Sequence, residues 1–218
     1  MQIFTLNYSD DVCNTYIIDD EKGKAALVDP GYGDSNAISE FLKKRSLSLE
    51  SILITHGHFD HIRGLTLVLK DFPDAKVYIH ENEVDFLSNP RLNCSYMDRD
   101  IKPVVLDVHP IKINDGDQIS ILGLETVVIH TPFHTHGSTC YYFPSLSIIF
   151  TGDTLFMNAI GRSDLPTGSP RSIISSLAKF KVLPPNTKVY PGHGKSTNIE
   201  RELKYNTFLA KEYIPNGK

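Results

Sequence analysis

His56-Gly57-His58-Phe59-Asp60-His61 places three imidazoles and one carboxylate within six residues. The stretch follows an apolar run over residues 51–55, so we expect a strand that ends in a loop and directs several ligands at one point. His56 and His58 are two residues apart and can face one metal ion, whereas Asp60 and His61 can face a second point nearby. Imidazole and carboxylate ligands without thiolate suit Zn, Fe or Mn. The stretch therefore predicts a metal site rather than a solvated polar loop.

Three further loops carry candidate ligands. His134 follows the apolar run that ends at His130, Asp153 follows the run 146–151, and His193 follows the run 188–190. Each of these loops contains Gly or Pro, and active sites tend to form where loops meet at one edge of a rigid scaffold. If the strands all end at the same edge, the four loops converge on one site. Three other histidines, His80, His109 and His130, are expected to be structural or surface residues.

The composition is that of an ordinary globular protein. The chain has 218 residues, of which 40% are hydrophobic and 22% charged, so one domain over residues 1–218 is favoured over two. The net charge of −4 without a basic cluster argues against nucleic acid, and no apolar run is long enough for a membrane span. The first residues do not have the pattern of a secretory signal, and the three cysteines are far apart. We therefore expect a cytoplasmic protein without disulfides.

The order of the predicted elements favours two similar halves. Asp34 or Ser35 can cap the first helix, and residues 43–45 place cations in its last turn. Residues 89–103 have no periodicity and are expected to form an irregular excursion, a candidate lid over the site. We predict strands over 3–8, 13–19, 25–28, 51–55, 76–80, several short ones over 104–151, and 188–190; helices around 36–45, 65–72, 81–88, 171–180 and 199–212; and a long loop over 157–169. Alternation of this kind predicts an α/β protein, a four-layer αββα sandwich.

The four ligand loops together resemble the metallo-β-lactamase superfamily, over nearly the whole chain from residues 29–31 to the last helix. Residues 161–166 and 199–202 are similar to short, single-domain proteins of the hydroxyacylglutathione hydrolase (glyoxalase II) type. The resemblance implies the following ligands for two metal ions: His56, His58 and His134 for the first, Asp60, His61 and His193 for the second, and Asp153 as the bridge between them.

The resemblance also implies an activity. Two divalent ions, Zn with Fe or Mn as alternatives, would activate a water to attack a small-molecule thioester such as S-lactoylglutathione. Asp60 and Asp153 would be the catalytic carboxylates. Asp29 and Thr55 are candidates to orient the ligand histidines, because such histidines normally donate their second N–H to an acceptor. We expect neither nucleic acid nor membrane as a partner, and the oligomeric state is left open.

The chain departs from the family pattern in two places. In the loop of His134, Phe133 and His136 replace the usual Gly and Pro, so Phe133 is expected to narrow the pocket or alter the turn, and His136 is a spare ligand, a proton shuttle or a surface residue. The glutathione-binding Cys-Gly-Lys loop and the Tyr after the last ligand are absent, as we expect the C-terminal helical domain of the longer enzymes to be. Arg162 and Lys195 stand there as candidate ligands for a substrate carboxylate, or as solvated charges.

Other functions fit the same residues. A persulfide dioxygenase of this scaffold would hold a single iron with His56, His134 and Asp153. Hydrolysis of a lactone needs the same activated water and stays open. A nuclease is disfavoured by the short, slightly acidic chain, and a secreted β-lactamase by the missing signal. A structural metal site would be closed by four ligands, often Cys, whereas seven candidate ligands without Cys favour an enzyme.

Overall fold

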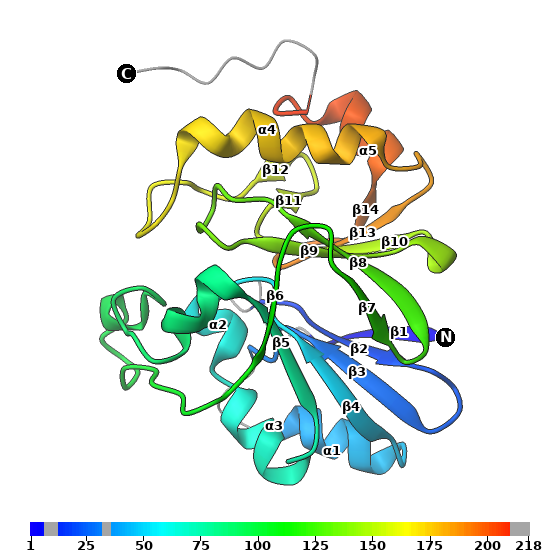
Figure 1. Cartoon of the computed structure of the whole chain (residues 1–218), viewed down its shortest axis with the longest axis vertical. Coiled ribbons are helices and arrows are strands. Elements are labelled where there is room, and N and C mark those ends of the chain that lie inside the picture. The colour runs from blue at the N-terminus through cyan, green and yellow to red at the C-terminus, as the bar shows by residue number, and fades with distance from the viewer. Residues whose placement is uncertain (7–12, 32–35, 210–218) are drawn as a thin grey trace.

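The computed structural model describes residues 1–6, 13–31 and 36–209, and within these residues two six-stranded sheets face each other (Figure 1). The first sheet has the strand order β1 (Gln2–Leu6), β2 (Thr15–Asp19), β3 (Lys24–Val28), β4 (Ser48–Leu53), β5 (Lys76–His80), β6 (Ile111–Ile113). The second sheet has the order β14 (Thr197–Asn198), β13 (Lys188–Pro191), β10 (Ile148–Gly152), β9 (Thr139–Phe143), β8 (Leu124–His130), β7 (Gln118–Ile121). A small hairpin, β11 (Leu155–Phe156) and β12 (Ala159–Ile160), stands apart from both.

Helices cover the outer face of each sheet (Figure 1). On the first sheet these are α1 (Ala37–Lys44) and α3 (Leu65–Asp71), and on the second α4 (Ile173–Ala178) and α5 (Ile199–Tyr205). The remaining helical segments are short: α2 (Phe59–Ile62) and the 3₁₀ helices η1 (Glu81–Leu87), η2 (Ser95–Met97), η3 (Pro144–Leu146), η4 (Pro170–Ser172) and η5 (Lys179–Val182). The arrangement confirms the predicted four-layer αββα sandwich.

The period-2 alternation of the strands builds three layers of core. In β2, Ile17 packs toward α1 and α3, whereas Tyr16 and Ile18 on either side of it pack between the sheets. In β10, Phe150 packs between the sheets and Ile149 packs toward α4 and α5. Successive residues of these strands face two different apolar layers. This explains why the strand sequences are continuously apolar instead of alternating between apolar and polar residues.

The strands that precede the candidate ligands end at the same edge of the sandwich. β8 and β10 are each antiparallel to β9, and β10 is parallel to β13, so β8, β10 and β13 run in one direction. In the other sheet β3, β4 and β5 are parallel. Hydrogen bonds connect β9 of the second sheet with the residues just after β4 of the first. The Thr139 N–H donates to the Thr55 carbonyl at 2.9 Å, and the Tyr141 hydroxyl donates to the Ile54 carbonyl at 2.8 Å. The expected convergence of the strand ends is confirmed.

Several predicted elements differ from the observed ones. The short helix predicted over 81–88 is a 3₁₀ helix over residues 81–87, and β12 interrupts the long loop predicted over 157–169. The last helix, expected to reach residue 212, ends at Tyr205, because Asn206 turns to an extended conformation and donates its side-chain amide to the Ala159 carbonyl at 3.1 Å. The predicted cap at Asp34 or Ser35, the strand residues 7–8 and the helix residues 210–212 lie outside the described residues.

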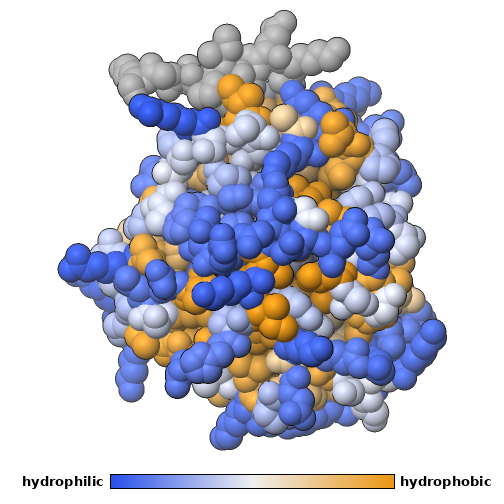
Figure 2. Space-filling view, viewed as in Figure 1, coloured by the Kyte–Doolittle hydropathy of each residue, from blue (hydrophilic) through white to orange (hydrophobic). Residues whose placement is uncertain are grey.

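The surface is mainly polar on the face shown in Figure 2, where apolar side chains appear between the hydrophilic ones. Among the helices of the described ranges, none is long and apolar enough to cross a membrane.

Candidate metal centre

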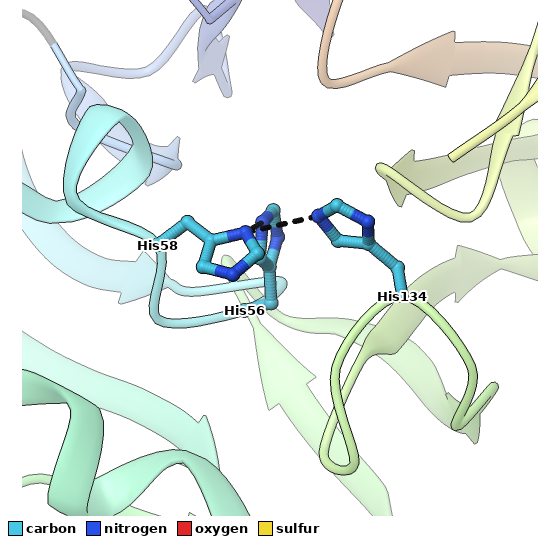
Figure 3. Close-up of side chains that lie close together, drawn as sticks. All are labelled: His56, His58 and His134. Carbon is cyan, nitrogen blue, oxygen red and sulfur yellow. Dashed lines mark hydrogen bonds between the residues drawn. The ribbon is translucent and has the colours of Figure 1, made fainter. Parts of the chain in front are cut away.

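The first ligand group joins one loop of each sheet. His56 Nε2 lies 3.1 Å from His58 Nδ1, and His58 Nδ1 lies 3.0 Å from His134 Nε2 (Figure 3). The rings of His56 and His58 come from the loop between β4 and α2, and that of His134 from the loop after β8. Two nitrogens on one tetrahedral zinc ion are about 3.3 Å apart. The His58 nitrogen therefore already lies at ligand spacing from both of the others, and all three nitrogens lie within 4.8 Å of one another.

The second ligand group lies beside the first, and Asp153 lies between them. Asp60 Oδ2 is 3.1 Å from His193 Nε2 and 3.6 Å from His61 Nε2. Asp153 Oδ1 is 3.4 Å from His61 Nε2, and Asp153 Oδ2 is 3.4 Å from His134 Nε2 and 3.7 Å from His193 Nε2. The structure thus brings together all seven residues that the sequence predicted as ligands, with Asp153 within reach of both groups.

Hydrogen bonds orient the ligand rings from behind. The His61 Nδ1–H donates to Asp29 Oδ2 at 2.9 Å, so His61 Nε2 is the nitrogen that faces the site. Asp29 also accepts from the Thr55 N–H at 2.7 Å and the Thr55 hydroxyl at 2.6 Å. His134 Nδ1–H donates to the Arg162 carbonyl at 2.7 Å. The predicted orienting roles of Asp29 and Thr55 fit these contacts, and metal ligands are commonly held in this way.

The surroundings shift the pKa values of the ligands in different directions. Burial and the neighbouring His134 lower the pKa of His58 to about 3, and burial with the other histidines lowers the pKa of His56 well below its usual range. Burial alone would lower the pKa of His61 as well, but Cys13 and the carboxylates around it raise that pKa well above the ordinary value, so His61 holds a proton that a bound metal would displace. The carboxyl of Asp153 has a lowered pKa because the histidine charges outweigh its burial. Neutral imidazole and ionised carboxylate are the forms that bind metals.

The cluster fits a divalent metal ion by its own chemistry. His61 Nε2 and Asp153 Oδ1 are fully buried and have no hydrogen-bond partner, although both are strong polar groups. Buried polar groups in proteins are otherwise paired almost without exception. Gly192 leaves room for this arrangement, since a Cβ there would lie 2.2 Å from Asp153 Oδ1 and 2.8 Å from His61 Cε1. The donor set of imidazole and carboxylate suits Zn, Fe or Mn.

Glu83 in η1 was not predicted, and it ties the two loops of the first ligand group together. It is fully buried, and its carboxylate accepts from the Gly57 N–H at 2.7 Å and the Gly137 N–H at 2.8 Å. Burial raises the pKa of Glu83 to about 7, against the hydrogen bonds from Gly57, Thr135 and Gly137 that lower it. A Cβ at Gly137 would lie 2.6 Å from Glu83 Cγ, so only glycine admits this close contact.

Asn14 was also missed, and it holds the loop of His193. Its side-chain amide donates to the Pro191 carbonyl at 3.0 Å and to the Gly194 carbonyl at 2.9 Å, on both sides of His193. Glu83 and Asn14 both bind backbone groups that are distant in the sequence, and no local sequence pattern predicts such contacts. The glycines at 57 and 137, one in each ligand loop, were the available signal for a side chain that approaches the backbone there.

The other predicted residues lie around the site in different ways. The guanidinium of Arg162 is exposed and pairs with Asp164 at 2.7 and 2.8 Å, and Lys195 is exposed beside the His193 loop. His136 belongs to none of the converging ligand groups found in the described residues; its ring lies 5.6 Å from that of Phe86. Of the two roles expected for Phe133, narrowing the pocket is wrong, because Phe133 is fully buried in the core beneath α4, whereas an effect on the turn stays a prediction.

The segment 89–103 flanks the site, as expected for an irregular excursion. The Asn93 carbonyl accepts from the Phe59 N–H at 2.8 Å, and the Asn93 amide donates to the Phe86 and Val104 carbonyls at 2.8 and 2.9 Å. Asn93 therefore anchors the segment to the ligand loop from a buried position. The three histidines that the sequence predicted to be structural or surface residues lie outside the ligand groups. The ring centroids of His80 and His130 are 4.1 Å apart and the rings stack, and His109 is exposed.

Comparisons of the sequence agree with this geometry. Residues 8–193 match the model of the metallo-beta-lactamase superfamily. A probable metallo-hydrolase of Bacillus subtilis, YqgX, is 36% identical over 196 residues, with 89% of this chain and 90% of that protein covered. A hydroxyacylglutathione hydrolase of Aeromonas hydrophila is 38% identical over 167 residues, which cover 77% of this chain and 56% of that enzyme.

Comparisons of the structure give the same fold. The B3 metallo-beta-lactamase BLEG-1 has a TM-score of 0.86 at 32% identity, covering 95% of this chain and 99% of that one. TTHA1623 in a di-iron-bound form has a TM-score of 0.81 at 30% identity, covering 94% and 100%. ETHE1 from Myxococcus xanthus has a TM-score of 0.75 at 26% identity, covering 95% and 84%. The chain, with its fold and its cluster of histidines and aspartates, belongs to the metallo-beta-lactamase superfamily.

Proposed function

We propose that the chain is a metal-dependent hydrolase that cleaves a small-molecule thioester such as S-lactoylglutathione. The observation that carries the proposal is Asp153, whose two oxygens face ligand nitrogens of both groups at 3.4 Å. A carboxylate in this position can bridge two ions. His56, His58 and His134 would hold one ion and Asp60, His61 and His193 the other, most simply two Zn, with Fe or Mn as the alternatives.

Bound metals at such a site supply an activated water and polarise the carbonyl under attack. The residues of the chain hold and orient that centre. His56 and His58 stay neutral in their buried positions and are ready to bind without losing a proton. Asp29 fixes the ring of His61, and the Arg162 carbonyl fixes that of His134. A thiolate leaves without a strong general acid, which fits a site whose polar groups are nearly all metal ligands.

The relatives support a hydrolase more directly than they support a substrate. The name of the Bacillus protein, probable metallo-hydrolase, agrees with the reaction class. The hydroxyacylglutathione hydrolase of Aeromonas agrees with a glutathione thioester, but the chain spans only 56% of that enzyme. The thioester is therefore part of the proposal, and a lactone or another ester is the competing substrate class on the same site.

The test is a rate assay with purified, metal-loaded protein and S-D-lactoylglutathione, following the loss of thioester absorbance. We expect hydrolysis in the wild type and its loss in Asp153→Ala. Absence of hydrolysis in protein that contains two metals per chain would overturn the thioester proposal and direct the search to lactones and other esters.

A second function, persulfide dioxygenase, is supported by the geometry of three of the ligands. His56 shares one converging group with His134 and another with Asp153, and His134 Nε2 lies 3.4 Å from Asp153 Oδ2, so the three residues could hold a single iron. Oxygen uptake with glutathione persulfide, together with one iron per chain, would support this function. Two metals per chain and no oxygen uptake would support the hydrolase.

A further inference from the structure

A pocket of about 520 Å³ lies beside the loop that carries His58 and Asp60. Its lining includes Phe59, Cys94, Met97, Arg99, Arg162 and Leu165. Phe59 stands between the ligands His58 and Asp60 in the sequence, and the carbonyl of Arg162 accepts the hydrogen bond from His134. The loop of His58 and Asp60 therefore contributes to the pocket directly, and the loop after β12 adjoins His134 through the Arg162 carbonyl, so the pocket lies beside the ligands and reaches to the segment 89–103.

The charges of this pocket are balanced rather than cationic. Arg162 is paired with Asp164 through two hydrogen bonds, at 2.7 and 2.8 Å. Arg99 lines the pocket between Asp98 and Asp100, which line it as well. A site for a carrier with several carboxylates would instead present cations that no acid of the protein offsets.

The apolar part of the lining is open to a ligand. Phe59, Met97 and Leu165 present a ring, a flexible thioether and a branched chain, and Met97 is 56% exposed. The Cys94 thiol adds to this surface, because burial raises its pKa to about 11 and keeps it neutral. Apolar surface exposed in a concave site is stabilised when an apolar ligand covers it, and Met adapts to ligands of different shape.

From these observations we infer that the pocket binds an apolar group attached to the scissile thioester, and that the enzyme hydrolyses thioesters with such a group faster than S-lactoylglutathione, whose carrier has several carboxylates. The inference rests on the proposed function, since it assigns the pocket to the substrate of the metal centre. The apolar group can belong to the acyl side or to the thiol side, and the experiment distinguishes the two.

The experiment measures kcat/KM for two series of thioesters with metal-loaded protein. In the first, acetyl, butyryl and hexanoyl groups are carried by N-acetylcysteamine; in the second, acetyl is carried by alkyl thiols of two, four and six carbons. We expect one series to rise by about fourfold per added methylene, the value for burial of a CH₂ group. Met97→Asp and Leu165→Asp should flatten that series. Tyr96→Asp is the matched control, because Tyr96 is 54% exposed, adjoins Met97 and is not part of the lining, so its slope should match the wild type.

Two flat series in an active enzyme would overturn the inference and leave the hydrolase standing. A steep series that Met97→Asp and Leu165→Asp leave unchanged would overturn it too. If no thioester is hydrolysed, the proposed function fails, and calorimetry with S-ethyl and S-hexyl thioethers of N-acetylcysteamine decides the pocket separately. Tighter binding of the S-hexyl compound, lost in Met97→Asp, would support an apolar site; equal binding of both would overturn it.

Discussion

Asp153 is the residue on which both ligand groups depend. Its oxygens lie 3.4 Å from His61 Nε2 and from His134 Nε2, one nitrogen of each group. Asp153→Ala should therefore remove bound metal and lower kcat/KM roughly 100-fold or more, since even residues outside the ligand sphere cost 10–100-fold. Metal content by mass spectrometry and the rate assay give the two readouts.

The matched control for Asp153→Ala is Asp107→Ala, which removes the carboxyl of a fully exposed aspartate. It should keep both the metal content and the rate of the wild type. Wild-type metal content and rate in Asp153→Ala would rule out a bridging role for this carboxylate.

At the scale of elements, η1 connects the two loops of the first ligand group through Glu83. In Glu83→Gln, the amide NH₂ would face one of the two backbone N–H donors, Gly57 or Gly137, so one hydrogen bond is lost. We expect the affinity of the first ligand group for metal to fall about 10–100-fold. Competition with a chromophoric chelator measures it, and Glu81→Gln, an exposed residue of the same helix, is the control. Equal affinity in the two variants would mean that Glu83 does not position the ligands.

Glu83 also predicts a pH dependence of stability. Its pKa is raised from 4.5 to about 7 in the folded chain, with burial as the main cause. Between these values the unfolded chain loses the proton and the folded chain keeps it, so the free energy of unfolding falls as pH rises, by up to about 3 kcal/mol. Urea unfolding of metal-free wild type and Glu83→Gln from pH 4.5 to 7.5 checks this. The variant should lack this part of the slope, and parallel pH profiles would contradict the prediction.

The ligands were predictable from the sequence, whereas the residues that support them were only partly so. His56, His58 and His61 share one short motif, and strand direction brings His134, Asp153 and His193 to the same edge. Glu83 and Asn14 contact backbone groups of distant loops, which leave no periodic or local trace. Asn206 likewise ends α5 through a contact with the β12 segment, so the helix was predicted too long.

For the whole molecule, the metal centre joins the two halves of the sandwich. Four of the ligands lie in the loop after strand β4 of the first sheet: His56, His58, Asp60 and His61. The other three ligands follow strands of the second sheet. Binding at 1,000 times Kd stabilises the folded state by about 4 kcal/mol. For a chain of 218 residues this is a rise in Tm of roughly 8–16 °C.

Calorimetry before and after chelation, and again after metal is restored, measures this contribution. We expect Tm to fall on chelation and to recover when metal is restored. Asp153→Ala, which should bind little metal, should show only a small change in Tm on chelation or restoration. An unchanged Tm in wild type from which all metal has been removed would show that the ions do not join the halves.

The overall architecture followed from the sequence because the central strands, such as β2, β3 and β10, are buried on both faces and the covering α-helices on one. Ile17 and Leu27 pack outward under the helices, and Phe150 and Tyr141 pack between the sheets. The pocket was not predictable, because its lining combines residues 94–100, Phe59 and the loop after β12. These segments meet only in the folded chain.

The most direct test of the metal centre is anomalous diffraction from crystals of metal-loaded protein, recorded at the absorption edge of the bound element. We predict two peaks, one enclosed by His56, His58 and His134 and one by Asp60, His61 and His193, with Asp153 between them. A single peak, or peaks away from these residues, would contradict the two-metal centre on which the proposed hydrolase depends.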